Sequence, residues 1–314
     1  LLKTMDSQKF HTPVLLKETL SLLLTNPSGI YLDGTIGYGG HSEKLLSQLS
    51  KEGHLIGLDL DPYALEHTKK RLSESQNSYS LHNINFREYP FLLQTLGIEK
   101  LTGILFDLGT SSSQINSEHR GFSFQKNGPL DMRLNPNADY NASTFLNNAG
   151  ESEISKVLQE YGEERNHKKI AEMIFKACKN NCMKTTFDLK SVVSKCVHPR
   201  FLTKSLARVF QSIRIKINGE LDSLKTALKS SSDWLALGGR IAVISFHSLE
   251  DRIVKQFFKE SMLKCTCPKD YPICKCNRTP SLKVIQRKAI IPSEKELKKN
   301  PRSRSAKLRV AEKV

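Results

Sequence analysis

A glycine-rich turn, DGTIGYGG at residues 33–40, lies between a short apolar run and a helical pattern. Glycines in such a turn let backbone N–H groups and a helix N-terminus approach a ligand closely. The spacing matches neither G-x-G-x-x-G nor G-x-x-x-x-G-K followed by Ser or Thr, so pyrophosphate and triphosphate ligands lose support. An acid followed by G-x-x-G-x-G-G instead suits a ligand that has a free ammonium group and no phosphates.

S-adenosylmethionine (SAM) is a ligand of this kind, because its amino-acid end carries an ammonium and its ribose carries two hydroxyls. Asp59 ends the second predicted strand, where an acid can accept hydrogen bonds from a ribose. A tight turn followed by a helix-capping acid would have the same sequence, so this interpretation stays open as an alternative. Asp107 ends the fourth predicted strand, at the edge where the active site of a parallel sheet opens.

Alternating strands and helices are predicted for the first third of the chain. The predicted strands are 29–35, 53–61, 84–90 and 101–109, and the predicted helices are 39–49, 62–72 and 91–96. This alternation is typical of a parallel, doubly wound α/β sheet.

The pattern breaks at residues 110–143, which are crowded with Ser, Asn, Gly and Pro. A loop of this length inside a compact domain is usually functional. The chain is then helical to about residue 213, which predicts an inserted helical subdomain at 126–213 between two parts of the sheet domain, 1–125 and 214–314. A helix and an apolar strand follow, then a helix at 248–260. Strands at 281–291 and 305–314 are expected to form an antiparallel hairpin at the sheet edge.

The chain is strongly basic. Its 48 Lys and Arg against 32 Asp and Glu give a net charge of +16. Residues 251–314 hold 18 basic and 6 acidic residues, a net +12, which favours salt-sensitive binding to nucleic acid over contact with anionic lipid. No run approaches the length of a membrane span and the first residues lack the apolar core of an export signal, so we expect a cytoplasmic protein with no membrane partner.

The seven cysteines are an odd number, which argues against a disulfide framework. Four of them, Cys265, Cys267, Cys274 and Cys276, form the pattern C-x-C, six residues, C-x-C. Such a set could hold a structural zinc in tetrahedral geometry. Reduced, unliganded thiols are the alternative.

Nine motifs follow one another along nearly the whole chain. They are HTPVLLKE, DGTIGYGGHS, GLDLDP, DLGTSSSQ, RGFSFQKNGPLDMRLNP, YGEER, QSIRIKINGEL, GGRIAVISFHSLEDRIVK and NPRSRSAKLRVAE. In this order they resemble the bacterial small-subunit rRNA cytosine-N4 methyltransferases of the MraW/RsmH type. The resemblance implies a Rossmann-like class I SAM-dependent methyltransferase that acts on a cytidine in the decoding centre of 16S rRNA, free or in the small ribosomal subunit. It leaves open whether the chain forms a homodimer.

The resemblance also implies which residues hold SAM. By matching motif they are Gly39, Gly40, His41, Asp59, Phe86, Asp107 and Gln114. Asp59 is implied to bind the ribose and Phe86 to flank the adenine, with Phe91 as an alternative to Phe86.

Methyl transfer from a sulfonium to an exocyclic amine is an in-line displacement, for which positioning is the main catalytic demand. The N4 amine shares its lone pair with the ring, and an acceptor for its protons would localise that pair. Asp107 is the hypothesised acceptor, although DLGT lacks the prolines and aromatic of D-P-P-Y-like motifs. A purely cofactor-binding role is the alternative. His247, after the fifth strand, is predicted either to contact substrate or to order its loop.

Two pairs in the long loop are further candidates. Asp131 and Arg133 are expected near the mouth of the site, and Phe122 and Phe124 either stack a flipped base or pack into a core. Two other protein classes remain. A nicotinamide-dependent oxidoreductase would need the missing phosphate-binding glycine pattern, and a non-catalytic RNA-binding factor would not explain a SAM-type pocket.

Overall fold

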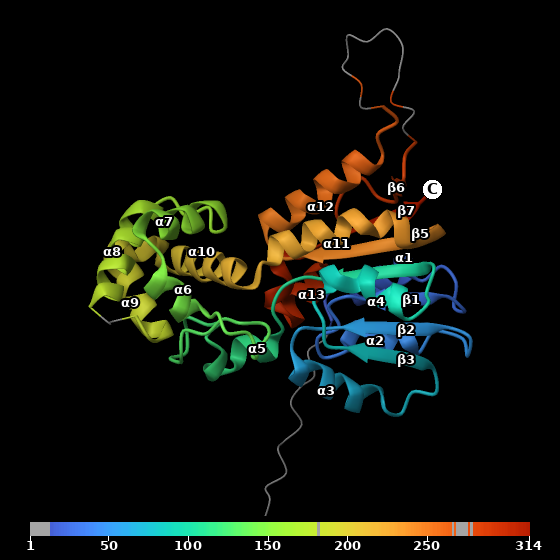
Figure 1. The fold of residues 1–314 in the computed structure, drawn as a ribbon, viewed down its shortest axis with the longest axis horizontal. Helices are drawn as coiled ribbons and strands as arrows, with labels where there is room; N and C mark the ends of the chain where they lie inside the picture. The colour runs from blue at the N-terminus through green and yellow to red at the C-terminus, as the bar shows by residue number, and fades with distance from the viewer. Residues whose placement is uncertain (1–12, 181–182, 266, 268–275, 277–278) are drawn as a thin grey trace, which may run out of the picture. The chain divides into compact units, whose positions relative to one another are not determined.

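The computed structural model describes residues 13–180, 183–265, 267, 276 and 279–314 (Figure 1). Its strands form one seven-stranded sheet in the order β3-β2-β1-β4-β5-β7-β6. The strands are β1 Ile30–Asp33, β2 His54–Leu58, β3 Ser78–His82, β4 Leu101–Asp107, β5 Leu235–Ser245, β6 Leu282–Val284 and β7 Lys307–Lys313. The ladders among β1 to β5 are parallel, whereas β7 runs antiparallel to both β5 and β6. The predicted Rossmann-like α/β fold and the antiparallel hairpin at the sheet edge are confirmed.

The chain divides into two compact units. The sheet unit comprises residues 1–109 and 223–314, and the helical unit comprises residues 110–222. The helices that belong to the sheet unit or lead into it are α1 Leu16–Leu23, α2 Gly40–Leu46, α3 Pro62–Leu72, α4 Tyr89–Thr95, α11 Glu220–Trp234, α12 Ser248–Ser261 and α13 Glu294–Lys299.

Helices cover both faces of the sheet. Successive residues of a strand point to opposite faces, so a strand in the interior of the sheet can contribute to two cores. In β4, Ile104 and Phe106 pack into one core with residues of α4, α11 and α12. Leu105 packs into the other core with residues of α1 and α2 (Figure 1). A parallel sheet that is buried on both faces has apolar strands and leaves polar chemistry to the loops at the strand ends.

One predicted strand is wrong. Residues 84–90 form a short 3-10 turn, Phe86–Glu88, and the start of α4, while the third strand is Ser78–His82. The Asn85 side chain accepts the N–H of Arg87 and so starts the turn. Because β3 lies at the sheet edge, with none of its residues fully buried, its polar sequence SYSLH lacks the apolar signal that was used to predict strands.

The helical unit contains α5 Ser112–Asn116, α6 Ala142–Asn148, α7 Glu151–Glu160, α8 His167–Lys179, α9 Thr186–Cys196 and α10 Pro199–Asn218. The apolar faces of α6 to α10 share one core. The sequence placed this insert at 126–213, whereas the compact unit begins at Thr110 and ends at Asp222. The long loop belongs to it because Leu130 and Met132 are buried in the helical core.

Among the helices that the structure describes, none is both long enough and apolar enough to span a bilayer.

Candidate active site

The glycine turn joins the carboxyl end of β1 to the start of α2. Gly39 caps α2 with a φ of 75°, a left-handed conformation that favours glycine. Gly40 begins the helix beneath Pro13, and a Cβ at this position would lie 2.5 Å from the Cγ atom of Pro13. The N–H of Gly39 donates to the Ile36 carbonyl at 2.8 Å. The N–H groups of Gly40 and His41 lie in the first turn of α2, where a helix offers them no internal partner, and Pro13 packs directly against Gly40.

Two side chains from α3 secure this turn. The Thr68 hydroxyl donates to the Gly37 carbonyl at 2.7 Å, and the Arg71 guanidinium donates to the Tyr38 carbonyl at 3.2 Å. Arg71 also pairs with Glu43 of α2 at 2.8 Å. The sequence analysis missed Thr68 and Arg71, whose spacing of three residues on one helix face was the available signal.

Asp59 follows β2 and holds the turn from the other side. Its carboxylate accepts the N–H of Gly37 and the N–H of Asp61, both at 2.8 Å. Burial raises the pKa of Asp59 to about 6, although these two hydrogen bonds act to lower it. Each carboxylate oxygen can still accept a second hydrogen bond, so Asp59 can order the turn and bind a ligand hydroxyl together.

Asp33 ends β1 and is 2% exposed. One carboxylate oxygen accepts the N–H of Thr35 at 3.2 Å, and the other accepts the Ser42 hydroxyl at 2.7 Å. Burial raises the pKa of Asp33 to about 6 against the lowering effect of the Ser42 bond. Both oxygens thus bind the turn and the start of α2, which makes Asp33 a residue that shapes the turn.

Asp107 ends β4 next to this cluster. Its N–H donates to the Thr35 hydroxyl at 2.6 Å, and its Oδ2 atom lies 3.3 Å from Nδ1 of His41. The other oxygen, Oδ1, is buried and has no hydrogen-bond partner among the described residues. A buried acceptor without a partner is costly, so this atom is a candidate to bind an N–H group of a ligand or substrate.

Phe86 lies in the turn after β3, and its ring centroid is 5.2 Å from that of Phe106 in β4. Its Cβ atom is 3.2 Å from the position that a Cβ on Gly34 would occupy. Phe91 is 74% exposed on α4. Of the two alternatives, the one that lies against the glycine turn is Phe86.

Gln114 belongs to the helical unit, in α5. Its Oε1 atom accepts the N–H of Ser111 at 2.9 Å, and its own N–H donates to the Ser111 hydroxyl at 3.1 Å. This capping box starts the short helix. Gln114 is therefore placed by local capping within its own unit.

His247 caps the N-terminus of α12 after β5. Its Nδ1 atom accepts the N–H of Glu250 at 3.4 Å, and its Nε2 atom is 3.1 Å from Oε1 of Glu250. The other Glu250 oxygen accepts the N–H of Phe246 at 2.8 Å. These contacts match the second alternative for His247, in which its side chain orders the loop after β5.

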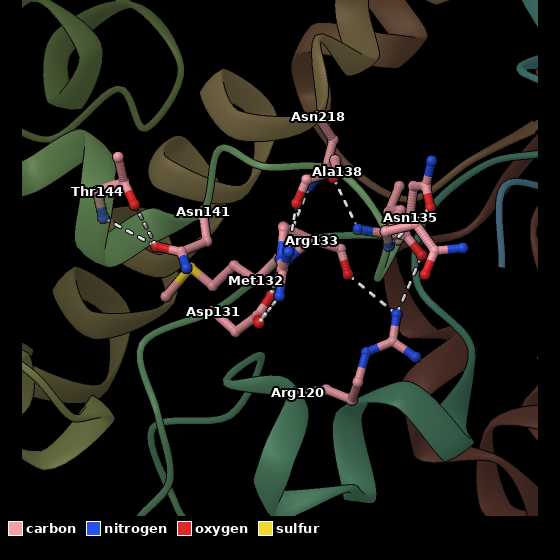
Figure 2. A network of polar contacts seen from close by, with 11 residues as sticks. Arg120, Asp131, Met132, Arg133, Asn135, Ala138, Asn141, Thr144 and Asn218 are labelled. Carbon is pink, nitrogen blue, oxygen red and sulfur yellow. Dashed lines mark hydrogen bonds and ion pairs between the residues drawn. The ribbon is translucent and has the colours of Figure 1, made fainter.

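The Asp131 and Arg133 pair lies in the helical unit and orders its long loop (Figure 2). The Arg133 guanidinium binds both Asp131 oxygens, at 2.7 and 2.9 Å. Figure 2 also shows Arg120 and Asn218, whose side chains bind backbone carbonyls of the same loop. Arg120 donates to the Arg133 carbonyl at 2.9 Å, and Asn218 donates to the Met132 carbonyl at 2.8 Å. These polar groups of the loop thus have their hydrogen-bond partners within the helical unit itself.

Phe122 and Phe124 pack against the core of the helical unit. The Phe124 ring meets the Phe210 ring edge-on, with centroids 5.6 Å apart. These contacts match the core-packing alternative for the two rings.

Three of the four clustered cysteines lie together. The thiol sulfurs of Cys265, Cys267 and Cys276 are all within 4.8 Å of one another. The fourth predicted ligand, Cys274, lies outside the described residues. Three convergent thiols are three of the four donors that a structural zinc site needs.

Comparison with known proteins identifies the family to which the sequence is similar. The sequence model of the MraW methylase family matches residues 8–314. Three similar proteins are each called ribosomal RNA small subunit methyltransferase H. The one from Caldicellulosiruptor bescii is 47% identical over 97% of this chain and 99% of its own length, that from Heliobacterium mobile is 46% identical over 97% and 99%, and that from Fusobacterium nucleatum is 41% identical over 97% and 97%.

Proposed function

We propose, because this chain belongs to the MraW methylase family, that it transfers the methyl group of SAM to the N4 amine of a cytidine in the decoding centre of 16S rRNA. The names of its relatives support the small-subunit rRNA as substrate. Ribosomes occupy the cytoplasm, so the proposal places the chain there.

The observation that carries the proposal is the set of carboxylates at the ends of β1, β2 and β4. Asp59 orders the glycine turn and keeps acceptor capacity for a ribose hydroxyl. Asp107 presents a buried oxygen that lacks a partner among the described residues. The N-terminus of α2 offers N–H groups to a carboxylate, and the Phe86 ring offers an apolar face to an adenine. These groups fit SAM, which has no phosphate to be bound.

When bound, SAM supplies an electrophilic methyl group on a sulfonium. The chain's own contribution is to hold the nucleophile and take its proton. The Asp107 carboxylate would accept an N–H of the cytosine amine, which localises the nitrogen lone pair. As the methyl group of SAM passes to the amine, the Asp107 carboxylate would take the amine proton, which leaves the methylated nitrogen neutral. A carboxylate is basic enough for this step, because a methylated and protonated exocyclic amine of cytosine is strongly acidic.

The helical unit is proposed to recognise the RNA, together with the basic residues of the C-terminal part. Residues 251–314 carry a net +12, which attracts a polyanion and makes its binding sensitive to salt. Phosphate contacts of this type position the substrate without reading its sequence.

The test of the function uses isotope-labelled SAM with small ribosomal subunits from a strain that lacks the modification. We expect mass spectrometry to find the label on the exocyclic nitrogen of one decoding-centre cytidine, and the Asp107→Asn variant to place far less of it. Label on a ring carbon or a ribose oxygen, or no label with wild-type protein, would overturn the N4 assignment. Calorimetric titration with SAM and with NADH separates the methyltransferase from an oxidoreductase.

We also propose that Cys265, Cys267, Cys274 and Cys276 hold one structural zinc. The three described thiols lie within 4.8 Å of one another, and a loop of this size has too little apolar content for its own core. Elemental analysis of protein purified without chelators should find about one zinc per chain, and Cys265→Ser should lose it. The control is Cys178→Ser, because this cysteine is buried in the core of the helical unit and is not one of the clustered thiols. Fewer than about one zinc in ten chains would refute the proposal.

A further inference from the structure

His41 lies between the Val14 carbonyl, which can only accept a hydrogen bond, and the Asp107 carboxylate, which can only accept when it is ionised. Its Nε2 atom is 2.9 Å from the carbonyl oxygen of Val14, and its Nδ1 atom is 3.3 Å from Oδ2 of Asp107. The side chain is 5% exposed, so water is not available as a substitute partner for either nitrogen.

A neutral imidazole has one N–H and one lone pair. In either neutral form, one ring nitrogen of His41 would therefore turn its lone pair toward an oxygen lone pair in a buried site. The imidazolium form has two N–H groups and satisfies Val14 and Asp107 together. With Asp107 ionised, the contacts thus favour the doubly protonated ring.

The segment that His41 reaches is strained and is held from a second side. Leu15 has a φ of 54°, the left-handed region that non-glycine residues rarely adopt, and it is fully buried. Its N–H donates to Oε1 of Glu296 in α13 at 2.8 Å. Pro13 packs against Gly40, where there is no room for a side chain. Strained backbone of this kind persists only where surrounding contacts fix it, and it concentrates at functional sites.

We propose that His41 is a positioning residue, which in its imidazolium form holds residues 13–15 over the glycine turn and holds Oδ2 of Asp107, so that Oδ1 stays available to the amine. The role assigned to Oδ1 rests on the proposed function. The charge state of His41 and its hold on residues 13–15 do not.

The surrounding charges agree with this assignment. Burial acts to lower the pKa of His41, but the hydrogen bond to Asp107, the charges of Asp107 and Asp33, and the Val14 carbonyl outweigh it and raise the pKa above its ordinary value of 6.5. Asp33 faces the ring from β1 and Asp107 faces it from β4, and His41 itself belongs to α2. SAM binding and turnover should therefore fall as the pH rises through the pKa of His41.

The direct test is nitrogen NMR of the full chain labelled with 15N-histidine, without SAM, across pH 6 to 9. The His41 signals are identified by their loss in His41→Asn. We expect both ring nitrogens to carry protons at pH 7. A ring with one unprotonated nitrogen at pH 7 would overturn the proposal whatever the activity measurements show.

Two neutral variants separate the two bonds. An Asn amide can replace the donor at Nδ1, so His41→Asn keeps a bond to Asp107, whereas the longer Gln replaces the donor at Nε2 and keeps the bond to Val14. Both should weaken SAM binding about 10- to 150-fold, the effect of losing one hydrogen bond to a charged group. Both should also lose the alkaline fall that wild type shows, and His41→Asn should keep the higher kcat.

The control is His54→Gln at the opposite end of β2, where the ring contacts Ser78 and Ser80. It should keep wild-type SAM affinity and pH dependence. An alkaline fall that survives in both His41 variants would refute the positioning role. An imidazolium signal together with RNA that gains no N4 label would instead refute the proposed function and leave the charge assignment intact.

Discussion

Replacement of Asp59 by Asn should lower the affinity for SAM while it changes the stability of the fold only a little. Asp59 accepts two backbone N–H groups, from Gly37 and Asp61, each at 2.8 Å. An Asn side chain has one oxygen, so one of these N–H groups would face an amide NH₂ in place of an acceptor. The change removes a buried charge, one hydrogen bond and the acceptor proposed for the ribose.

Two opposing effects on stability are of similar size. Burial raises the pKa of Asp59 from 3.8 to about 6, so keeping it ionised at pH 7 costs about 3 kcal/mol relative to an exposed acid. Asn relieves this cost but leaves a backbone N–H unpaired, which costs about 1–3 kcal/mol. The free energy of unfolding without SAM should therefore change by no more than about 2 kcal/mol. SAM affinity should fall about 10- to 150-fold, because a charge-assisted hydrogen bond is worth about 1.5–3 kcal/mol.

Urea unfolding at pH 7 measures the first quantity and calorimetric titration with SAM measures the second. Asp61→Asn is the matched control, since Asn caps α3 as well as Asp does, and it should bind SAM like wild type. If Asp59→Asn binds SAM with wild-type affinity, Asp59 does not contact the cofactor. A loss of affinity that merely follows a large loss of stability would equally contradict the reasoning, because the site would then have failed through unfolding.

Three further predictions concern stability. Gly40→Ala places a Cβ 2.5 Å from Cγ of Pro13 and should cost about 1–3 kcal/mol in urea unfolding. Asp251→Asn breaks the ion pair with Arg309, whose Nε atom is 2.7 Å from the Asp251 carboxylate, and should cost about 2 kcal/mol at pH 7. Burial acts to raise the pKa of Asp251, but the hydrogen bonds from Arg309 and Lys307 outweigh it and lower the pKa. The stabilisation by this ion pair therefore exists above pH 4 and is lost in acid. The contribution of Asp33 to stability depends on pH in the opposite direction, because its pKa is raised to about 6. Wild type should lose up to about 3 kcal/mol of stability relative to Asp33→Asn as the pH rises from 4 to 6.5.

Each of these has an internal check. Gly150→Ala adds a Cβ that meets nothing within 4 Å, so it should cost far less than Gly40→Ala. Lys307→Met removes the more exposed partner of Asp251 and should cost less than Asp251→Asn. An Asp33→Asn profile that parallels wild type through pH 4 to 6.5 would show that Asp33 does not titrate there.

The sequence allowed prediction of the elements whose residues are buried on both faces or repeat with a helical period. The strand segments around Leu32, Ile56 and Ile104 are continuous apolar runs, and each forms a strand of the sheet. The edge strand Ser78–His82 was missed because an edge requires little burial. The extent of the helical unit could not be read either, since Leu130 and Met132 join its core from a loop without any period.

For the site, spacing identified the residue types but not their partners. Asp59 and the glycine turn are close in sequence and in space, so their pairing follows from the βαβ connection. Thr68 and Arg71 act on the turn through backbone carbonyls, so their spacing of three residues could place them on one helix face but could not identify their partners. The contact of His41 with Val14 joins residues 27 positions apart through an irregular segment, and its direction depends on the left-handed conformation of Leu15.

The charges of the site explain how it can favour a cationic cofactor. Asp33 and Asp59 are buried carboxylates that resist ionisation, with the pKa of each raised to about 6. In the proposed imidazolium form, His41 compensates the charge of Asp107, 3.3 Å away, so the negative charge left uncompensated belongs mainly to Asp33 and Asp59. A ligand with a sulfonium and an ammonium would supply that compensation and recover part of the cost of burying the acids. A nicotinamide dinucleotide would bring further negative charge to the same carboxylates. The same electrostatics that destabilise the empty site thus discriminate between the two ligand classes.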